Sequence, residues 1–408
     1  MASFYIPVTG LESDTTALNT IANDLANLNT TGFKAQSVNF ADVFYDQIGV
    51  NGADNLLQLG AGDKVSSIES NFTAGTPTAT GNNSDVALTG SGFFVINNGG
   101  SDLYTRDGNF TIASNGDLMT QAGLQVMGYP AANGVVNTNA SLVPLNIPQD
   151  GVQQAKPTGS FGFTANLDAT AAVNSQVTTQ VPAYDSLGEP QEITITYTKT
   201  GNNTWNYSIA LPAGASTGSA NTTGTLTFDT SGNLTAPAAD VAGISFTGLT
   251  DGAADLNMTW NVLGAAGTPT VTQTDQASGY SATIQDGYAA GQYQSYAINS
   301  DGTVVVKFTN GNDQAVGQIA LANFVNLQGL QMLGNDEFGA TRSSGPAAIG
   351  ISGSAGLGSM ESGNLESSNV NISQEFSDLI IAQRAFEANS KAITTFDTVA
   401  QETINMIH

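Results

Sequence analysis

The sequence of 408 residues contains no cysteine, and its one histidine is the final residue, His408. Without cysteine there can be no disulfide, no thiolate metal ligand and no cysteine nucleophile. A Ser-His-acid triad needs an imidazole held within hydrogen-bond reach of the serine, and the end of a chain holds a side chain poorly. We therefore predict that the protein is not an enzyme and uses no metal or other cofactor.

Positive charge is scarce as well, with 9 Lys and Arg against 34 Asp and Glu, a net charge of -25. Nucleic acids and anionic membranes both attract basic surfaces, so the balance predicts neither as a partner. Such a charge keeps a monomer soluble and makes its self-association sensitive to salt.

Long apolar runs are missing too. No stretch approaches the roughly 18 consecutive apolar residues that a membrane-spanning helix requires. The first residues, "MASFYIPVTGLESD", also lack the basic and apolar segments of a secretory signal. We expect no membrane insertion, and export from the cell would have to use another kind of signal.

The middle of the chain is rich in glycine and alternates polar with apolar residues. Stretches such as "QEITITYTKTGNNTWNYSIAL" and "GTVVVKFTNGNDQAVGQIALANF" have the period of two that is typical of strands. Dipeptides of Asp-Gly or Asn-Gly favour hairpin turns because both residues adopt positive φ readily. We predict such turns at four pairs: Asp107-Gly108, Asn115-Gly116, Asp301-Gly302 and Asn310-Gly311.

Helical periodicity is confined to the two ends. Near the N-terminus, apolar residues occupy heptad positions at Leu11, Leu18, Ile21, Leu25 and Leu28. Thr9 and Glu12 have the spacing of a capping box, and Gly32 is the expected terminator of this helix.

The C-terminal segment carries an apolar residue at every seventh position. An Asn or Ser, Asn371 or Ser373, can cap the predicted helix. Its heptad residues are Ile372, Leu379, Phe386, Ile393, Ala400 and Ile407. Terminal helices of this kind pair with each other, with other molecules, or with the β domain of their own chain, and periodicity alone leaves these alternatives open.

Several blocks of the sequence together resemble one family. The opening "VTGLESDTTALNTIANDLANLNTTGFKAQSVNFADVF" and the closing "ESSNVNISQEFSDLIIAQRAFEANSKAITTFDTVAQETINMI" are similar to the two terminal signatures of the flagellar rod and hook family. Interior blocks match in the same order, among them "GSGFFVI", "YTRDGNF", "YDSLG" and "GQIALANFVNLQGLQMLGNDEF".

The resemblance implies a structural subunit that polymerises into the curved, flexible tube between flagellar motor and filament, outside the cell. The long middle β block favours the hook branch of the family. A distal rod or other axial subunit is the alternative, and a secreted β-rich adhesin is a more distant one. The implied partners are other copies of the chain, the distal rod, hook cap and hook-filament junction proteins, and the gate of the flagellar type III export apparatus.

We accordingly expect a mainly β fold with α-helical termini, built from discontinuous domains. The terminal helices would form a coiled-coil layer, and β-rich domains would lie outside it. The expected segments are an N-terminal helical polymerisation segment (1–32), a connecting and export-signal segment (33–70), the first half of an inner β domain (71–148), an outer β domain (149–284), the second half of the inner domain (285–345), a Gly/Ser-rich linker (346–365) and a C-terminal helical polymerisation segment (366–408).

The resemblance also suggests roles for particular residues. The two heptad stripes are the expected polymerisation surface, with helices that are disordered before assembly. A stripe of asparagines, Asn19, Asn23 and Asn27, is expected to bond between subunits or line the channel, unless it is only a solvated face. Phe40 and Phe44 of "FADVF" are expected to signal export, unless their rings are local anchors. The expected hinges are Gly32, Gly353, Gly356 and Gly358.

Overall fold

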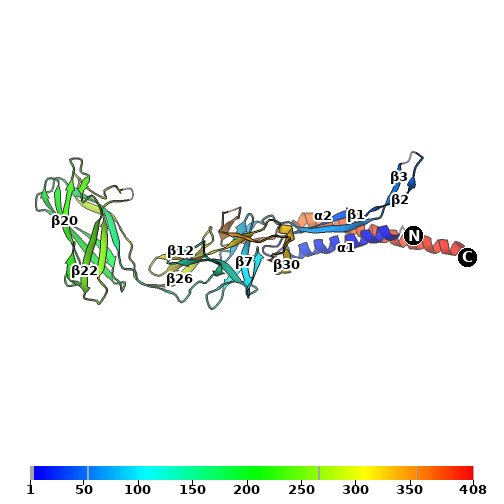
Figure 1. Cartoon of the computed structure of the whole chain (residues 1–408), viewed down its shortest axis with the longest axis horizontal. Helices are drawn as coiled ribbons and strands as arrows, with labels where there is room; N and C mark the ends of the chain where they lie inside the picture. Colours follow the sequence, from blue (N-terminus) through cyan, green and yellow to red (C-terminus); the bar gives the residue numbers. More distant parts are fainter. Residues whose placement is uncertain (1–3, 53–54, 265–266, 355, 408) are drawn as a thin grey trace. The chain divides into compact units, whose positions relative to one another are not determined.

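The computed structural model describes residues 4–52, 55–264, 267–354 and 356–407. These residues fall into two units (Figure 1). The first unit takes the chain up to residue 149 together with residues 295–306 and everything from 313 onward. The second takes residues 150–294 and 307–312. The mainly β fold with helical termini is confirmed, because within the described residues the two α-helices stand at the ends and strands fill the interval.

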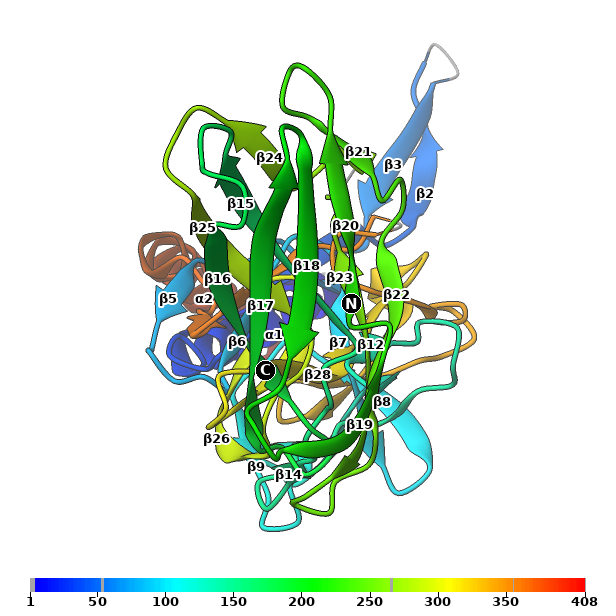
Figure 2. The same ribbon diagram turned by 90° about the vertical axis from the view of Figure 1, so that its left-hand side faces the viewer.

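The second unit is a sandwich of two β-sheets. One sheet has the order β19-β22-β23-β15-β24, with β25 also paired to β15, and the other has the order β16-β17-β18-β20-β21. Figure 2 shows β17 and β18 side by side in one of these layers. The strands that lie wholly in this unit are β14 (Val152–Gln153), β15 (Ser160–Asp168), β16 (Gln176–Tyr184), β17 (Pro190–Gly201), β18 (Thr204–Ala210), β19 (Ser216–Ala220), β20 (Thr223–Phe228), β21 (Leu234–Ala236), β22 (Val241–Leu249), β23 (Leu256–Asn261), β24 (Val271–Thr274) and β25 (Gly279–Gln285).

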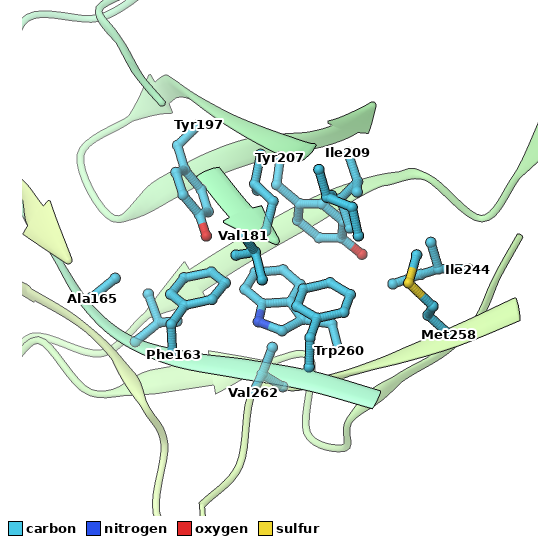
Figure 3. Close-up of a cluster of buried hydrophobic side chains, with 14 of the residues drawn as sticks. Phe163, Ala165, Val181, Tyr197, Tyr207, Ile209, Ile244, Met258, Trp260 and Val262 are labelled. Carbon is cyan, nitrogen blue, oxygen red and sulfur yellow. The ribbon is translucent and has the colours of Figure 1, made fainter. Parts of the chain in front are cut away.

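The core of the sandwich forms because alternate residues of each strand point inward. In β17, Ile193, Ile195 and Tyr197 are buried, and the threonines between them are partly exposed. Trp260 of β23 lies at the centre of this core, with its ring centroid 5.2 Å from that of Tyr207 and 5.6 Å from that of Phe163 (Figure 3). The two sheets are therefore joined by aromatic packing.

The first unit holds a larger sheet with β7 at its centre. β7 pairs with β8, β11 and β29, and the sheet continues from β11 to β28 and from β8 to β31 and β30. The strands of this unit are β1 (Gln36–Asp42), β2 (Tyr45–Val50), β3 (Leu56–Gly60), β4 (Asp63–Ser70), β5 (Pro77–Ala79), β6 (Val86–Thr89), β7 (Phe93–Asn98), β8 (Ser101–Thr105), β9 (Phe110–Ile112), β10 (Leu118–Thr120), β11 (Gln125–Ala132), β12 (Val135–Val136), β13 (Val143–Pro144), β28 (Asp313–Ile319), β29 (Leu321–Asn323), β30 (Gln331–Gly334), β31 (Glu337–Gly339), β32 (Ala348–Gly350), β33 (Ser359–Ser362) and β34 (Asn364–Glu366); β26 (Gly291–Ile298) and β27 (Thr303–Phe308) have residues in both units, and a 3₁₀ helix spans Leu327–Gly329.

Three of the four predicted turns are confirmed. Gly116, Gly302 and Gly311 have φ values of 88°, 84° and 82°, and their turns join β9 to β10, β26 to β27 and β27 to β28. The prediction at Asp107-Gly108 is wrong, because β8 and β9 do not pair with each other. Gly108 instead packs against the chain at Val86, where a Cβ would collide with the carbonyl oxygen.

The expectation of a Gly/Ser-rich linker over 346–365 is wrong for part of its length. Strands β32, β33 and β34 occupy it and pair with β29, β6 and β5. Small residues are needed here because backbones approach closely, and a Cβ on Gly358 would collide with the carbonyl oxygen of Thr89. The composition of this segment reflects tight packing at that point.

The two helices are α1 (Tyr5–Ala26) and α2 (Ile372–Ile407), and Figure 1 shows them side by side. The predicted capping box is wrong, because α1 begins before Thr9 and the Thr9 hydroxyl donates to the Ile6 carbonyl inside the helix. The other cap is confirmed: the Asn371 side chain accepts the N–H groups of Ser373 and Gln374 at the start of α2.

We predict that Trp260→Ala lowers the free energy of unfolding of the second unit by about 3–5 kcal/mol, because it leaves a large cavity between the sheets. Urea unfolding of the full chain, followed by the fluorescence of the remaining Trp205, measures this. Thr225→Ala, on the exposed face of β20, is the matched control and should change the midpoint little. Equal midpoints for the two variants would contradict the role of Trp260.

Candidate assembly surface

The helices α1 and α2 pack in antiparallel orientation. The rings of Phe4 and Phe396 pack at a tilt, with their centroids 5.7 Å apart. The Asn389 amide donates to the Asp14 carboxylate at 2.8 Å. Contacts therefore pair the beginning of α1 with the later part of α2. The α1–α2 pair is also flanked by β1 and β4, which both contact α1.

A glycine sets the distance between the two helices at one point. Gly10 of α1 faces Asn389, and a Cβ at position 10 would lie 2.6 Å from the Asn389 amide nitrogen. The close approach lets that amide reach Asp14 one turn further along α1. A polar contact thus fixes the register of the helix pair.

The most buried residues of α1 are mainly polar. Pro7, Thr9, Ser13, Thr20 and Asp24 are buried in the chain. The predicted leucine stripe is only half-buried at Leu11, Leu18, Ile21 and Leu25, and Leu28 lies beyond the end of the helix. Helix α1 ends at Ala26, and the Asn23 carbonyl accepts both the backbone N–H and the side-chain amide of Asn27 there. The role of this stripe in polymerisation stays a prediction.

Helix α2 likewise leaves much of its apolar surface uncovered. Its predicted stripe is half-buried at Leu379, Phe386, Ile393 and Ala400 and exposed at Ile372, and the side chain of Ile407 lies outside the described residues. A second apolar set, which the heptad pattern did not single out, is exposed: Phe376, Ile380, Ile381, Val399, Ile404 and Met406. Exposed apolar side chains in this number indicate a surface that another molecule covers.

The asparagine stripe runs along the solvent side of α1. Asn19 and Asn23 are exposed and Asn27 is half-buried. Asn27 bonds within its own turn, donating to Asn23 and accepting from the Thr30 hydroxyl at 3.0 Å. An intersubunit or channel-lining role for these amides stays a prediction.

An apolar hairpin extends from the β1–β4 ribbon. Strands β2 and β3 pair only with each other among the described residues, and they stand apart from the rest of the chain in Figures 1 and 2. Their exposed side chains are Tyr45, Ile48, Val50, Leu56, Leu57 and Leu59. An isolated two-stranded hairpin is marginal in water, so this one needs a further surface to stabilise it.

The two phenylalanines of the proposed export motif lie where the ribbon meets this hairpin. Phe40 is 48% exposed and Phe44 is 73% exposed. This exposure disfavours the alternative that both rings are local anchors. Recognition of the pair by an export gate stays a prediction.

Three buried charged side chains connect the segment after α1 and the segment before α2 to the β structure. Lys34 follows α1, Glu366 ends β34 and Arg106 follows β8, and each is no more than 3% exposed. The Glu366 carboxylate accepts from the Lys34 ammonium at 2.5 Å and from the Arg106 guanidinium at 3.3 Å. We call these three residues the charged triad.

Further polar contacts surround the triad. The Lys34 ammonium also donates to the Thr73 carbonyl, and the Arg106 guanidinium donates to the carbonyls of Leu88 and Gly90. Burial lowers the pKa of both cations, and Glu366 opposes that shift. The opposite charge of Glu366 offsets part of the loss of water that burial imposes on the two cations.

Next to the triad, Asn369 joins the two helical ends directly. Its side-chain oxygen accepts the Ala35 N–H at 2.8 Å, and its amide donates to the carbonyls of Asn71 and Thr73. The segment that follows α1 is thus bound to the segment that precedes α2.

The proposed hinge glycines fall into two kinds. A Cβ on Gly32 would lie 2.8 Å from the backbone beside Arg106, and Gly358 is equally confined, so packing explains both glycines. Gly353 and Gly356 have positive φ values of 73° and 78°, and a Cβ on either would have no other atom within 4 Å. A hinge role stays a prediction for these two.

The described residues contain no group of three acidic or histidine side chains placed to hold a metal ion. They also contain no helix long and apolar enough to cross a membrane.

Family models match three parts of the chain. Residues 4–34 match the flagella basal body rod protein model, residues 146–288 match the flagellar basal body protein FlaE D2 domain, and residues 361–406 match the C-terminal model of the flagellar basal body rod FlgEFG proteins. The flagellar hook protein FlgE of Salmonella typhimurium is 34% identical, over 99% of this chain and all of that protein. The chain belongs to the flagellar hook protein family. FlgE of Borreliella burgdorferi is similar at 34% identity over 100% of this chain and 99% of its own.

A solved structure shares the fold. The crystal structure of Helicobacter pylori flagellar hook protein FlgE2 matches with a TM-score of 0.55 over 71% of this chain and all of that chain, at 15% identity. The protein is a structural component of the bacterial flagellar hook, which lies outside the cell. Relatives that match over their full length also favour the hook over the rod alternative.

The charged triad was missed by sequence reasoning. The residues lie far apart in the chain, with 332 positions between Lys34 and Glu366 and 260 between Arg106 and Glu366. The available signal was the scarcity of basic residues, which makes each Lys or Arg noteworthy. Lys34 in "TTGFKA" and Arg106 in "YTRDGNF" are such residues.

We predict that Glu366→Ala lowers the free energy of unfolding of the first unit by about 3–5 kcal/mol, because two buried cations lose their counter-charge. Amide exchange of β5 and β6 in the full chain measures the effect, and exchange in the second unit should not change. The exposed Glu361→Ala on neighbouring β33 is the control. Unchanged exchange at β5 and β6 in Glu366→Ala would contradict the role of the triad.

Proposed function

We propose that this hook subunit polymerises into a curved, flexible tube through the α1–α2 pair and the β2–β3 hairpin. One observation carries the proposal: large apolar side chains are exposed along α2 and along both strands of the hairpin. The sandwich of the second unit, by contrast, encloses its large aromatic residues in a core of its own. Apolar surface left in water favours association in proportion to the area that association covers.

The half-buried leucines of α1 fit the same proposal. The residues of α1 that a single chain buries are mainly polar, so a single chain gains little from burial of the apolar groups of α1. Packing against neighbouring copies would bury the leucines and supply that missing stability. Helices that are weakly ordered before assembly and stable after it are the consequence.

The proposed partners follow from the position of this subunit in the flagellar hook. They are other copies of this chain, the distal rod, hook cap and hook-filament junction proteins, and the flagellar type III export gate, with Phe40 and Phe44 as the export signal. The proposed role is mechanical and non-enzymatic: a joint that transmits torque from motor to filament.

We predict that Phe376→Gln combined with Ile380→Gln raises the critical concentration for polymerisation at least about a hundredfold. These residues lie one turn apart on α2, and losing the burial of two apolar side chains is worth roughly 3 kcal/mol or more. Sedimentation and electron microscopy of the full chain measure it. Val173→Gln, an equally exposed apolar site in the second unit, is the control. Normal polymerisation of the double variant would refute this surface.

We predict that Phe40→Ala combined with Phe44→Ala reduces the secreted amount of the protein and leaves its intracellular amount unchanged. Both rings are exposed, so their removal should not lower stability appreciably. Immunoblots of culture supernatant and cell pellet provide the measurement, with Ile48→Ala in the same hairpin as the control. Equal secretion by the double variant and the wild type would disprove the export role.

A further inference from the structure

Asp24 is a buried ionisable residue of α1, on the side of the helix that meets β1. It is 0% exposed, and it lies near the end of α1, where its Oδ2 atom accepts the Gln36 N–H at 2.7 Å. Its Oδ1 atom is buried and has no hydrogen-bond partner among the described residues. A buried carboxylate with one oxygen unpaired is destabilising when it carries a charge.

The groups around Asp24 add to this destabilisation. Helix α2 contributes two further carboxylates, because Glu375 and Asp378 lie close enough that Asp24 and Asp378 both raise the pKa of Glu375, after burial as the main cause. The amide of Gln374 donates to both oxygens of Asp378. The end of α1 and the start of α2 therefore both carry acidic residues in this region.

No counter-charge reaches Asp24 from the other elements packed on α1. Strand β1 supplies the backbone N–H of Gln36, and its one charged residue is Asp42 at the far end of the strand. Strand β4 carries Asp63, Lys64 and Glu69, and none of these hydrogen-bonds Asp24. Lys34 lies after α1, where its ammonium is bound by Glu366 and Thr73.

A groove beside this cluster gives water access to the α2 carboxylates. It has a volume of about 470 Å³, and its lining includes Gln36, Glu375 and Asp378. Protons can thus reach the interface without unfolding of the pair. Burial raises the pKa of Asp24 to about 6, against an ordinary value of 3.8, and the Gln36 N–H opposes this rise.

We propose that Asp24 is a proton-dependent latch: the end of α1 is held tightly against β1 and the start of α2 when Asp24 is protonated, and this contact loosens when Asp24 ionises. The latch acts within a single chain, so it does not depend on the polymer. The sign follows from proton linkage, because the tight state binds a proton over the pH range in which the loosened state releases it. The contact therefore weakens as the pH rises toward and through the pKa of Asp24 in the folded chain, and above that value it stays weak.

The experiment measures amide protection of α1 in the full-length monomer between pH 5 and pH 8, corrected for the intrinsic exchange rates. With pKa values of about 6 in the tight state and 3.8 in the loosened state, protection should fall about tenfold across this interval. Amides of the second unit should show no such change. Constant protection of α1 in the wild type would overturn the proposal.

Asp24→Asn removes the titration and keeps an oxygen that can accept the Gln36 N–H. We expect the protection that the wild type has at pH 5, now independent of pH, and the exposed Glu12→Gln on the same helix should behave as the wild type. Because Asp24→Asn can change the packing, Glu375→Gln provides a second test, and the tenfold change should persist in it because Asp24 is still present. A pH dependence that persists in Asp24→Asn, or that disappears only in Glu375→Gln, would refute the latch at Asp24.

Discussion

The carboxylate of Glu366 is the point on which the rest of the first unit depends. It holds Lys34 and Arg106 in the interior, and through its backbone carbonyl the same residue also accepts the Gly32 N–H at 2.8 Å. Glu366 ends the strand that leads to α2. From there it binds both the segment after α1 and the segment after β8. The two ends of a 408-residue chain are brought together at this site, and the helix pair can form because of it.

Buried charges are an unusual choice for such a junction, because apolar packing can be equally stable. Their advantage is geometric. A carboxylate that accepts from two different cations, together with the amide of Asn369, fixes distances and directions that apolar contacts leave adjustable. Asp336 lies in the same region, where burial and the neighbouring Asp107 raise its pKa to about 6 while Lys34 opposes the rise. The junction is therefore specified by polar contacts throughout.

The α1–α2 pair reverses the usual distribution of side chains. Thr9, Ser13, Thr20 and Asp24 are buried, whereas Phe376, Ile380 and Ile381 are exposed. This arrangement is unfavourable for a single chain in water and favourable for a chain that joins others of its kind. The second unit follows the ordinary rule, with Trp260 and its aromatic neighbours enclosed between two sheets. The contrast explains how one part of the chain can remain ready for association while another is independently stable.

The sequence by itself determined the mainly β fold, the helices at both ends and three of the four predicted turns, because these follow from local periodicity and from residues that favour positive φ. It also indicated the family, since the matching blocks lie in order along the whole chain. It could not indicate which face of α1 is buried, because a heptad of leucines looks the same whether its partner is within the chain or in another molecule. Nor could it indicate that the segment from 348 to 366 contains the strands β32, β33 and β34, because glycines that allow close packing and glycines of a free linker have the same composition. The charged triad and the buried Asp24 were decided only by the tertiary structure, which brings together residues hundreds of positions apart and removes water from them.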